Sequence, residues 1–555
     1  MPRFLVSSES RATLHTVVMK LFVSLLAFCA STTALPFSLS IQQRLLLDKI
    51  LTSNEVLQDA LSGNELGFGA EVTSPYRIAI IGSGINGAAA AYTLAENARR
   101  NSKASVPSIT IFEQNGIFGG RITTAEVLTK PELTIDTCAA TIDSLQDTCI
   151  AELARSIGLS ITPAAEQDNG TAIWNGEHLV GFVEDKGFRD SASSSDFKKA
   201  RLETRYGFAP ATSERIQIEL GFSLAGTTLF KSLATEVGAR GLNTSLIKGA
   251  CEGDKEKLCR KGAKADLYLR EVIEAGVRDR FFGDYDELNE LNSVLGLTSE
   301  TSFASIDGGN LRLVDRLIKL SGADLLLNTR VERIVEVTES WNVTYIKGND
   351  RSTEAFDKVI VAASLSLANL ALPGSVNASI PLVDYADTVV THFTTRSFLS
   401  ASYFGTYPAP QTILTSATAT KAGNKVSLPF FSLRLLDNSI SESGATAPNN
   451  GQNLFKVVSS LPLSNETIAS FLEHDVESSS DEPVITWIHR EDLPRSVPRL
   501  DRTLKIQGEI EIAPGLFYAG NGAQVTDTIE FACRMGRNVG RLIIPSPVRN
   551  SPGNG

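Results

Sequence analysis

The 555-residue chain has fewer positive than negative charges, and its histidines and cysteines are scarce. Its 52 Lys and Arg residues stand against 63 Asp and Glu residues, a formal net charge of -11. A nucleic-acid binder needs a positive field, so this balance argues against one. Five His and six Cys are too few and too scattered for an array of zinc sites, and we expect no metal. With 42% hydrophobic and 21% charged residues, the composition excludes a wholly disordered or fibrous chain.

The N-terminus lacks an apolar run long enough to cross a bilayer, but it has the features of a secretory signal. Leu21–Ala30 is a ten-residue, mostly apolar run that basic residues precede. Small residues follow it at the positions that a signal peptidase recognises, so we expect residues 1–34 to be removed after Ala34. A start at Met19 and a short membrane anchor are the alternatives for this segment. We expect no stable membrane span elsewhere.

Five Asn-x-Ser/Thr triplets agree with passage through the secretory pathway. One such triplet is weak evidence, because it occurs by chance, but five beside a signal peptide favour a glycoprotein that is secreted or resides in a vacuole or lysosome. The predicted acceptors are Asn169, Asn243, Asn342, Asn377 and Asn465.

Five cysteines remain once the signal segment is removed. Cys251 and Cys259 enclose a short, charged stretch and are expected to pair in an oxidising compartment. Cys138 and Cys149 are a second possible pair. Cys533 is then left over, and its simplest interpretation is a buried small hydrophobe.

Organised structure is predicted from residue 76, after an N-terminal extension at 35–75. Arg77–Ile81 is typical of a buried parallel strand, Ala88–Arg100 of an alanine-rich helix, and Ile109–Phe112 of a second strand. Gly82-Ser-Gly-Ile-Asn-Gly87 lies at the turn between the first strand and the helix. This order predicts a βαβ unit with a glycine-rich turn.

Each residue of that turn has a physical reason to be there. Gly82 makes the tight turn, Gly84 lets the backbone approach a pyrophosphate, and Gly87 lets the helix pack closely on the strand. The helix N-terminus then binds phosphates through its free N–H groups. Glu113, at the end of the second strand, is placed to bind the hydroxyl pair of a ribose. We therefore predict a dinucleotide site that also includes Ser83.

The next motif distinguishes between dinucleotides. Gly119-Gly120-Arg121 begins six residues after Glu113, and Thr124 follows. This order resembles the extended fingerprint of the flavin amine oxidases and related FAD families, in which the glycine pair and the arginine lie against the diphosphate. An ordinary turn and a surface salt bridge are the alternatives. We take Gly120 and Arg121 as FAD-binding residues.

Later segments fit an FAD domain that the chain leaves and re-enters. The segment 325–335 resembles a strand that brings a valine, here Val331, against the adenine. A buried strand is predicted at 356–363. The segment 514–522 is a strand that ends in a turn at Gly520 and Asn521, and a helix follows at 526–543. Many relatives have an acid where this chain has Asn521.

The length exceeds one ordinary core, since about 150 residues per domain gives about three units or two large interleaved ones. The predicted class is α/β, a Rossmann-like FAD-binding domain of the GR2 type interleaved with a mixed α+β substrate or cap domain. We place the FAD-binding domain at 76–150, 300–370 and 505–545, the cap at 151–299 and 371–504, and a disordered tail at 546–555.

Four stretches of the chain resemble the prenylcysteine oxidase (prenylcysteine lyase) family. The segment with Gly308-Gly309-Asn310 is among the more specific ones, although Asp307 stands where the family has Glu. The four stretches are Ile78–Thr124, Arg205–Phe208, Ile306–Val314, and Asp527–Ala532 with the following Arg537-Asn538-Val539.

The resemblance implies an FAD-dependent oxidase of farnesyl- or geranylgeranyl-cysteine. In this family the carbon next to the thioether sulfur is oxidised, and hydride passes to flavin N5. Water adds to the resulting cation, and the adduct collapses to cysteine and an isoprenoid aldehyde. Molecular oxygen reoxidises the flavin and yields hydrogen peroxide. The implied partners are an isoprenoid thioether and oxygen, with an apolar tunnel supplied by the protein.

Four residues are candidates for roles beyond cofactor binding. His489, which has apolar and aromatic neighbours, is preferred over two other cap histidines as the group that activates water or collects a proton. Glu530 is a candidate contact to the flavin or to the substrate's amino end. Tyr206 and Trp487 are candidate wall residues of the tunnel. Packing or surface roles are the alternative for each.

Two other functions compete with this one. An FAD oxidoreductase of the same family that acts on another apolar or prenylated intermediate of specialised metabolism would carry the same motifs. A non-enzymatic lipid or partner binder with a degenerate flavin site is the third hypothesis. The intact glycine turn, Glu113 and Arg121 count against the third, whereas the motifs do not separate the first two.

Overall fold

The computed structural model divides the chain into two units, Met1–Ala70 and Glu71–Gly555, and every residue it describes belongs to the second. No helix among the described residues is long and apolar enough to cross a membrane. The described ranges are 76–101, 105–129, 133–138, 142–143, 148–163, 171–177, 179–184, 203–210, 263–285, 287–289, 291–293, 303–377, 380–405, 410–416, 428–440, 451–473, 484–500, 508–526 and 528–545.

Several predictions concern residues outside these ranges. They are the signal peptide at 1–34, the extension at 35–75, Asn169, Asn243, the pair of Cys251 with Cys259, and the tail at 546–555. Three predicted glycosylation sites lie inside the ranges. Asn342 is half-buried on a strand, Asn465 is exposed at the start of a short helix, and Asn377 ends another short helix.

A six-stranded sheet holds the N-terminal βαβ unit. All neighbouring strands pair in parallel except the last two, which pair antiparallel. Ile78, Ala79 and Ile80 on the central strand are fully buried, as expected for a parallel strand that is covered on both faces. In spatial order the strands are β10 (Asp324–Leu326), β2 (Ser108–Phe112), β1 (Arg77–Ile81), β14 (Lys358–Val361), β21 (Leu516–Tyr518) and β20 (Glu511–Ala513).

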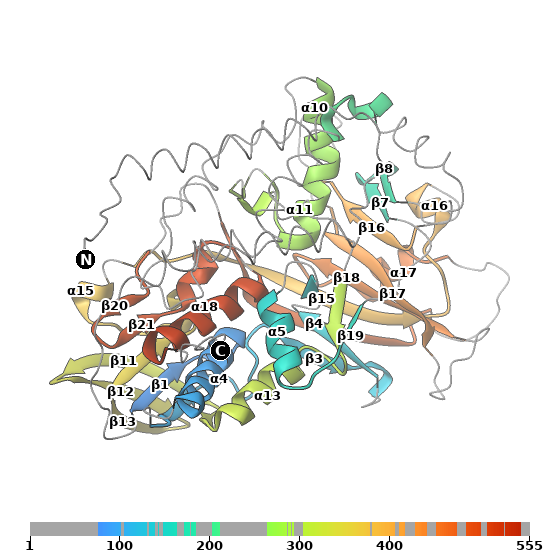
Figure 1. The fold of residues 1–555 in the computed structure, drawn as a ribbon. Helices are drawn as coiled ribbons and strands as arrows, with labels where there is room; N and C mark the ends of the chain where they lie inside the picture. Colours follow the sequence, from blue (N-terminus) through green and yellow to red (C-terminus); the bar gives the residue numbers. More distant parts are fainter. Residues whose placement is uncertain are drawn as a thin grey trace, which may run out of the picture. The chain divides into compact units, whose positions relative to one another are not determined.

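Two long helices, α4 (Ile85–Arg100) and α18 (Ile529–Ile543), pack side by side against this sheet (Figure 1). Glycines on α18 permit the close approach. A Cβ on Gly536 would lie 2.0 Å from the carbonyl oxygen of Asn86, so any side chain there would push the helices apart. The helix α13 (Leu311–Ser321) packs against α4, and its apolar stripe, which includes Leu313 and Leu317, is buried.

A disulfide joins α18 to α5 (Thr148–Ser156), and it corrects the sequence-based pairing. Cys149 bonds to Cys533 across 384 residues, with a Cα–Cα distance of 6.1 Å. The predicted pair of Cys138 with Cys149 is therefore wrong, and Cys533 is not the residue left over. The reason is tertiary, because α18 packs against α5. Cys138 lies instead on a strand whose neighbour carries Thr123.

A three-stranded antiparallel sheet follows β10, formed by β11 (Thr329–Val337), β12 (Ser340–Lys347) and β13 (Asp350–Phe356). The single strand predicted at 325–335 is thus two strands. β10 pairs with β2 in the large sheet, whereas β11 pairs with β12. Asn328 between them has a φ of 53°, a left-handed conformation that turns the chain from one sheet into the other.

A seven-stranded sheet contains the rest of the long strands. Its outer face packs on a core rich in aromatic side chains, among them Phe393, Phe455 and Phe471. In spatial order the strands are β19 (Trp487–Pro498), β15 (Tyr385–Thr395), β18 (Gln452–Ser459), β17 (Ser432–Ile440), β16 (Thr412–Thr415), β7 (Thr171–Trp174) and β8 (Leu179–Glu184).

A helical segment packs against this sheet at β16 (Figure 1). It consists of α10 (Ala263–Tyr268), the π-helical turn η4 (Leu269–Ile273) and α11 (Glu274–Phe281).

Smaller elements connect the two large sheets. The hairpin of β3 (Thr123–Glu126) and β4 (Thr134–Cys138) follows directly from Gly119-Gly120-Arg121 and contacts β15. The remaining elements are β5 (Ile142–Asp143), β6 (Ile161–Pro163), β9 (Phe303–Ile306), α14 (Leu365–Ala368), α15 (Gly374–Asn377), α16 (Ala401–Phe404), α17 (Asn465–Ser470) and the 3-10 turns η1 (Val127–Thr129) and η5 (Gly520–Gln524).

Candidate cofactor and substrate site

The turn between β1 and α4 has the geometry that its glycines predict. Gly82 has a φ of 104°, and its N–H donates to the carbonyl of Phe112 on β2 at 2.9 Å. A Cβ on Gly87 would lie 2.0 Å from the carbonyl oxygen of Gly82. Gly87 therefore sets how closely the helix lies on the strand, as a phosphate-binding turn requires.

Gly84 is different, because protein atoms leave room around it. A Cβ at this position would meet only the Gly119 carbonyl at 3.8 Å and the Gly120 Cα at 3.9 Å, both ordinary contacts. Gly84 and Gly119 form an isolated parallel bridge, so the two glycine motifs lie against each other although 35 positions separate them. Nothing within the described protein requires glycine at Gly84, so the space beside its backbone is open, as the predicted approach of a pyrophosphate needs.

Glu113 lies where β2 ends and is 5% exposed. Its Oε2 accepts hydrogen bonds from the Ser83 N–H at 3.1 Å and from the Ser83 hydroxyl at 2.7 Å, while Oε1 accepts from the Asn115 N–H at 3.0 Å. The carboxylate is therefore fixed against the glycine turn. Since each carboxylate oxygen can accept two hydrogen bonds, Oε1 can also receive a ribose hydroxyl.

The other predicted cofactor residues lie on separate elements. Arg121 donates from Nη1 to the carbonyl of Ser496 on β19 at 2.7 Å, which ties the glycine motif to the seven-stranded sheet. Gly520 begins η5, and a Cβ there would lie 2.2 Å from the carbonyl of Ala363, just after β14. Asn521 is the next residue of η5. Val331 is buried in the core between the two adjoining sheets.

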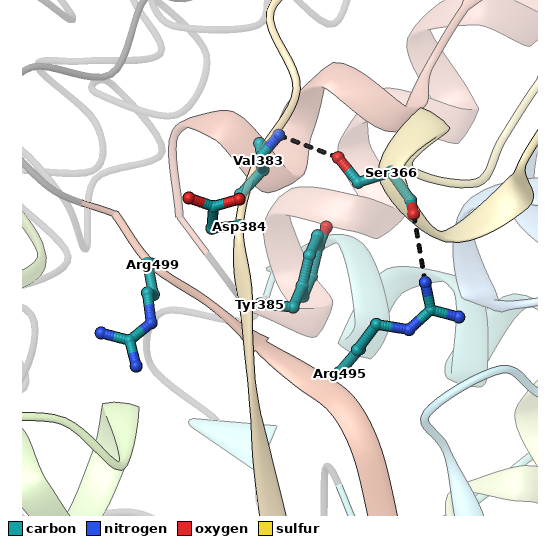
Figure 2. Close-up of a pocket in the computed structure, with 6 residues that line it drawn as sticks. All are labelled: Ser366, Val383, Asp384, Tyr385, Arg495 and Arg499. Carbon is teal, nitrogen blue, oxygen red and sulfur yellow. Dashed lines mark hydrogen bonds between the residues drawn. The ribbon is translucent and has the colours of Figure 1, made fainter.

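A pocket of about 450 Å³ opens beside the segment that Arg121 contacts (Figure 2). Pairing between β15 and β19 is irregular there, and Arg495 has a φ of 50°. In Figure 2, Arg495 and Tyr385 extend toward Ser366, and Arg499 lies on the other side of Tyr385. Two guanidinium groups and a carboxylate make this lining polar, so the pocket does not suit an isoprenoid chain, which needs apolar walls.

Trp487 and His489 lie together on β19. Their rings stack with centroids 6.1 Å apart, and His489 Nε2 is 3.9 Å from Glu491 Oε2. The His489 side chain is 36% exposed, so water can reach it. Trp487 packs with Leu454 and with residues of the β3–β4 hairpin. These two candidates therefore share one face of the sheet.

Glu530 and Tyr206 occupy buried networks. Glu530 accepts from the N–H groups of Cys149 and Ile150 at the start of α5 and pairs with Arg534. Burial raises the pKa of Glu530, while Arg534 and these N–H groups act against the rise. The Tyr206 hydroxyl donates to Glu271 at 2.7 Å, and its ring packs on Tyr268. Both arrangements bind protein segments to one another.

Lys456 and Asp136 are not among the residues predicted from the sequence, and His392 is one of the two cap histidines to which His489 was preferred. Lys456 is paired in register with His392, and His392 with His489, across three neighbouring strands. Both ring nitrogens of His392 are buried without a hydrogen-bond partner among the described residues. Burial lowers the pKa of His392 well below its ordinary value of 6.5. The lysine in the otherwise apolar run 454–458 is the sequence signal from which this cluster could have been found.

Comparison with known proteins assigns the chain to a family. Residues 225–551, more than half of the chain, match the family model of prenylcysteine lyase. The chain belongs to the prenylcysteine lyase family. Residues 80–157 also match an NAD(P)-binding Rossmann-like domain, the region that holds the glycine turn and Glu113.

Individual relatives are distant but extensive. Prenylcysteine oxidase 1 of Mus musculus is 24% identical over 470 residues, which cover 79% of this chain and 85% of that protein. Farnesylcysteine lyase of Arabidopsis thaliana is 26% identical over 370 residues, 62% of this chain and 68% of that protein. A solved structure of a triple mutant of putrescine oxidase has a TM-score of 0.53 at 15% identity and covers 85% of this chain and 99% of that one. That likeness shows a shared fold.

The described residues fit an FAD cofactor. The adenosine diphosphate half of such a cofactor needs three features that are present here. They are the open space beside Gly84, the N-terminus of α4 without a side-chain cap, and the fixed carboxylate of Glu113. The Gly119-Gly120 turn closes on this cradle, since a Cβ on Gly120 would lie 3.3 Å from Gly84 Cα.

Proposed function

We propose that the chain is an FAD-dependent oxidase that cleaves the thioether of prenylcysteine to an isoprenoid aldehyde, cysteine and hydrogen peroxide. One observation carries the proposal: the prenylcysteine lyase match at 225–551 is joined to a preformed dinucleotide cradle in which Gly84 faces Gly119. FAD, when bound, supplies the acceptor for the hydride of the carbon next to sulfur.

The protein's own residues bind and orient. The α4 N-terminus takes the diphosphate, and Glu113 takes the ribose. Arg121, held by the Ser496 carbonyl, keeps the cofactor turn in place against β19. Because the same strand carries His489 and Trp487, the cofactor turn and these candidate substrate residues are connected by one continuous element.

We assign His489 the handling of a proton and Trp487 a place in the wall of the prenyl site. His489 is partly exposed and has Glu491 near Nε2, so it can accept a proton from an attacking water molecule. Glu530 holds α5 to α18 and Tyr206 holds Glu271, so we assign both to support of the site rather than to contact with substrate.

We further propose that the enzyme works in the secretory pathway, in a vacuole or lysosome or outside the cell. The signal segment and the five glycosylation triplets support this location. A disulfide between Cys149 and Cys533 is consistent with an oxidising compartment. We expect Asn465, exposed at the start of α17, to carry a glycan.

Product analysis tests the proposed function. The purified holoenzyme is incubated in air with farnesylcysteine, and farnesal, free cysteine and hydrogen peroxide are quantified. Equal amounts of all three are expected. A Gly84→Val variant, in which a side chain fills the cradle, is expected to lack both FAD and products. Oxidation of a different prenylated compound, but not of farnesylcysteine, would instead support a role in specialised metabolism.

A further inference from the structure

The face of the seven-stranded sheet that lies toward the β3–β4 hairpin carries a row of basic side chains. Leu433, Phe455 and Phe393 point into the aromatic core on the outer face. Side chains alternate along a strand, so their neighbours point to the inner face. The strand register aligns four of these neighbours on β17, β18, β15 and β19, and they are Arg434, Lys456, His392 and His489.

Lys456 and His392 are the members of this row with no ion-pair partner among the described residues, and of the two only Lys456 is partly exposed. Arg434 pairs with Asp279 on α11, His489 lies near Glu491, and His392 is fully buried. The Lys456 residue as a whole is half-buried. Burial lowers the pKa of Lys456, and the positive charge of Arg434 adds to this shift, while Cys138, Asp279 and Asp136 act against it.

Asp136 on β4 lies opposite this row and is also half-buried. Its Oδ1 accepts from the Asn310 N–H at 2.8 Å and from the Thr124 hydroxyl at 3.2 Å. Asp136 and Lys456 interact electrostatically but form no direct ion pair in the described structure. The carboxylate therefore has a fixed position and retains Oδ2 for another donor.

The family-specific glycine segment explains why Asp136 is so placed. Gly309 has a φ of 96°, and a Cβ there would lie 3.0 Å from the Thr124 side chain and 3.3 Å from Asp136 Oδ1. Only glycine brings the Asn310 N–H to this carboxylate without a clash. The Gly308-Gly309-Asn310 motif thus serves to position Asp136, a role that its sequence alone did not reveal.

We propose that Lys456 and Asp136 bind the amino-acid end of the substrate, with Lys456 receiving the α-carboxylate and Asp136 the α-ammonium group. This assignment rests on the proposed function. Two opposite charges that face each other without touching are complementary to a zwitterion, whose own charges are separated by one carbon atom. The adjacent inward-facing positions of Leu454 and Trp487 are apolar, as the first part of a prenyl chain requires.

The alternative is that the two residues only stabilise the fold. A half-buried lysine without a direct partner lowers stability rather than raising it, because burial without pairing costs free energy. Burial likewise raises the pKa of Asp136 to about 6, although Asn310, Thr124 and Lys456 act to lower it. Both groups would be better satisfied by a charged ligand than by their present surroundings.

The test is a comparison of modified substrates with matched variants. The methyl ester of farnesylcysteine lacks the carboxylate charge, and N-acetyl-farnesylcysteine lacks the ammonium charge. For the wild-type holoenzyme, each modification is expected to lower kcat/KM about 10- to 100-fold, as loss of a charged hydrogen bond does. In Lys456→Met the penalty for the ester, and in Asp136→Asn the penalty for the acetyl group, is expected to disappear. Asparagine retains the oxygen that accepts from Asn310.

Lys319→Met is the control, because Lys319 is exposed on α13 with 72% of its side chain accessible, and it should keep both penalties. A Lys456→Met variant that lowers kcat/KM equally for the acid and the ester would overturn the assignment. If the FAD-loaded wild type oxidises none of the three compounds, the proposed function fails. In that case, equilibrium binding of farnesylcysteine and of its methyl ester is measured from the change in the flavin spectrum. Tighter binding of the acid that Lys456→Met abolishes would support the assignment of Lys456. Equal binding of acid and ester, or no binding, would contradict it.

Discussion

Replacement of Glu274 by Gln is expected to stabilise the protein at neutral pH. Glu274 begins α11 and is 1% exposed, and its Oε2 accepts from the Tyr285 N–H at 2.9 Å. Burial raises the pKa of Glu274 from 4.5 to about 8, and the nearby Asp284 adds to the rise, while the Tyr285 N–H and Arg278 oppose it. The folded protein therefore keeps this carboxyl protonated at pH 7, whereas the unfolded chain does not.

The magnitude follows from proton linkage. The pKa of Glu274 is higher in the folded protein than in the unfolded chain. Its contribution to the free energy of unfolding is therefore complete below pH 4.5 and is lost as the pH rises toward 8. Each pH unit in this window lowers the free energy of unfolding by about 1.4 kcal/mol, so the loss at pH 7 is about 3 kcal/mol. Glutamine is neutral at every pH and avoids this cost. An acidic compartment, where the cost is small, suits the wild-type residue.

Urea unfolding of both proteins between pH 4.5 and 8 checks this reasoning. Glu274→Gln should match the wild type near pH 4.5 and become progressively more stable above it. The buried His392 acts in the opposite direction, since its lowered pKa removes stability as the pH falls below 6.5, but it is present in both proteins and cancels. Glu336→Gln, an exposed carboxylate on β11, is the control. Parallel stability curves for wild type and Glu274→Gln would refute the argument.

Three further predictions concern the cofactor, the disulfide and the glycan. Gly84→Ala should fold normally, because a Cβ there meets no protein atom closer than 3.8 Å, but it should retain at least about 10-fold less FAD, because the Cβ occupies phosphate space. Gly87→Ala should be unstable. Full FAD occupancy in Gly84→Ala would contradict this placement of the phosphates. Cys533→Ser should lower the free energy of unfolding by about 2–5 kcal/mol, measured by urea titration, and an unchanged midpoint would argue against the bond to Cys149. Asn465→Gln should remove one endoglycosidase-sensitive increment of apparent mass; an unchanged mass would show that this site carries no glycan.

Local patterns in the sequence correctly predicted the backbone geometry of the glycine turn. The turn at Gly82 and Gly87 is determined by neighbouring residues, since a left-handed φ and a close backbone approach both demand glycine. The carboxylate of Glu113 likewise follows from the end of a strand. Spacing along one segment is sufficient information for features of this kind.

Features that depend on distant segments were not predictable in the same way. The bond between Cys149 and Cys533 requires the packing of α5 on α18. The split of the strand at 325–335 reflects competition between two sheets for one segment. The alignment of Lys456 with His392 depends on the register between β18 and β15, and the position of Asp136 opposite Lys456 depends on the contact between β4 and β15. The sequence of a single segment does not determine either of these.

The central claim is that prenylcysteine reduces a flavin held by this chain. The most direct measurement is anaerobic mixing of the FAD-loaded protein with farnesylcysteine while the visible flavin spectrum is recorded. The account predicts prompt loss of the oxidised flavin absorption together with formation of farnesal and cysteine, and then formation of hydrogen peroxide when air is admitted. A flavin that remains oxidised in the presence of saturating farnesylcysteine would contradict it.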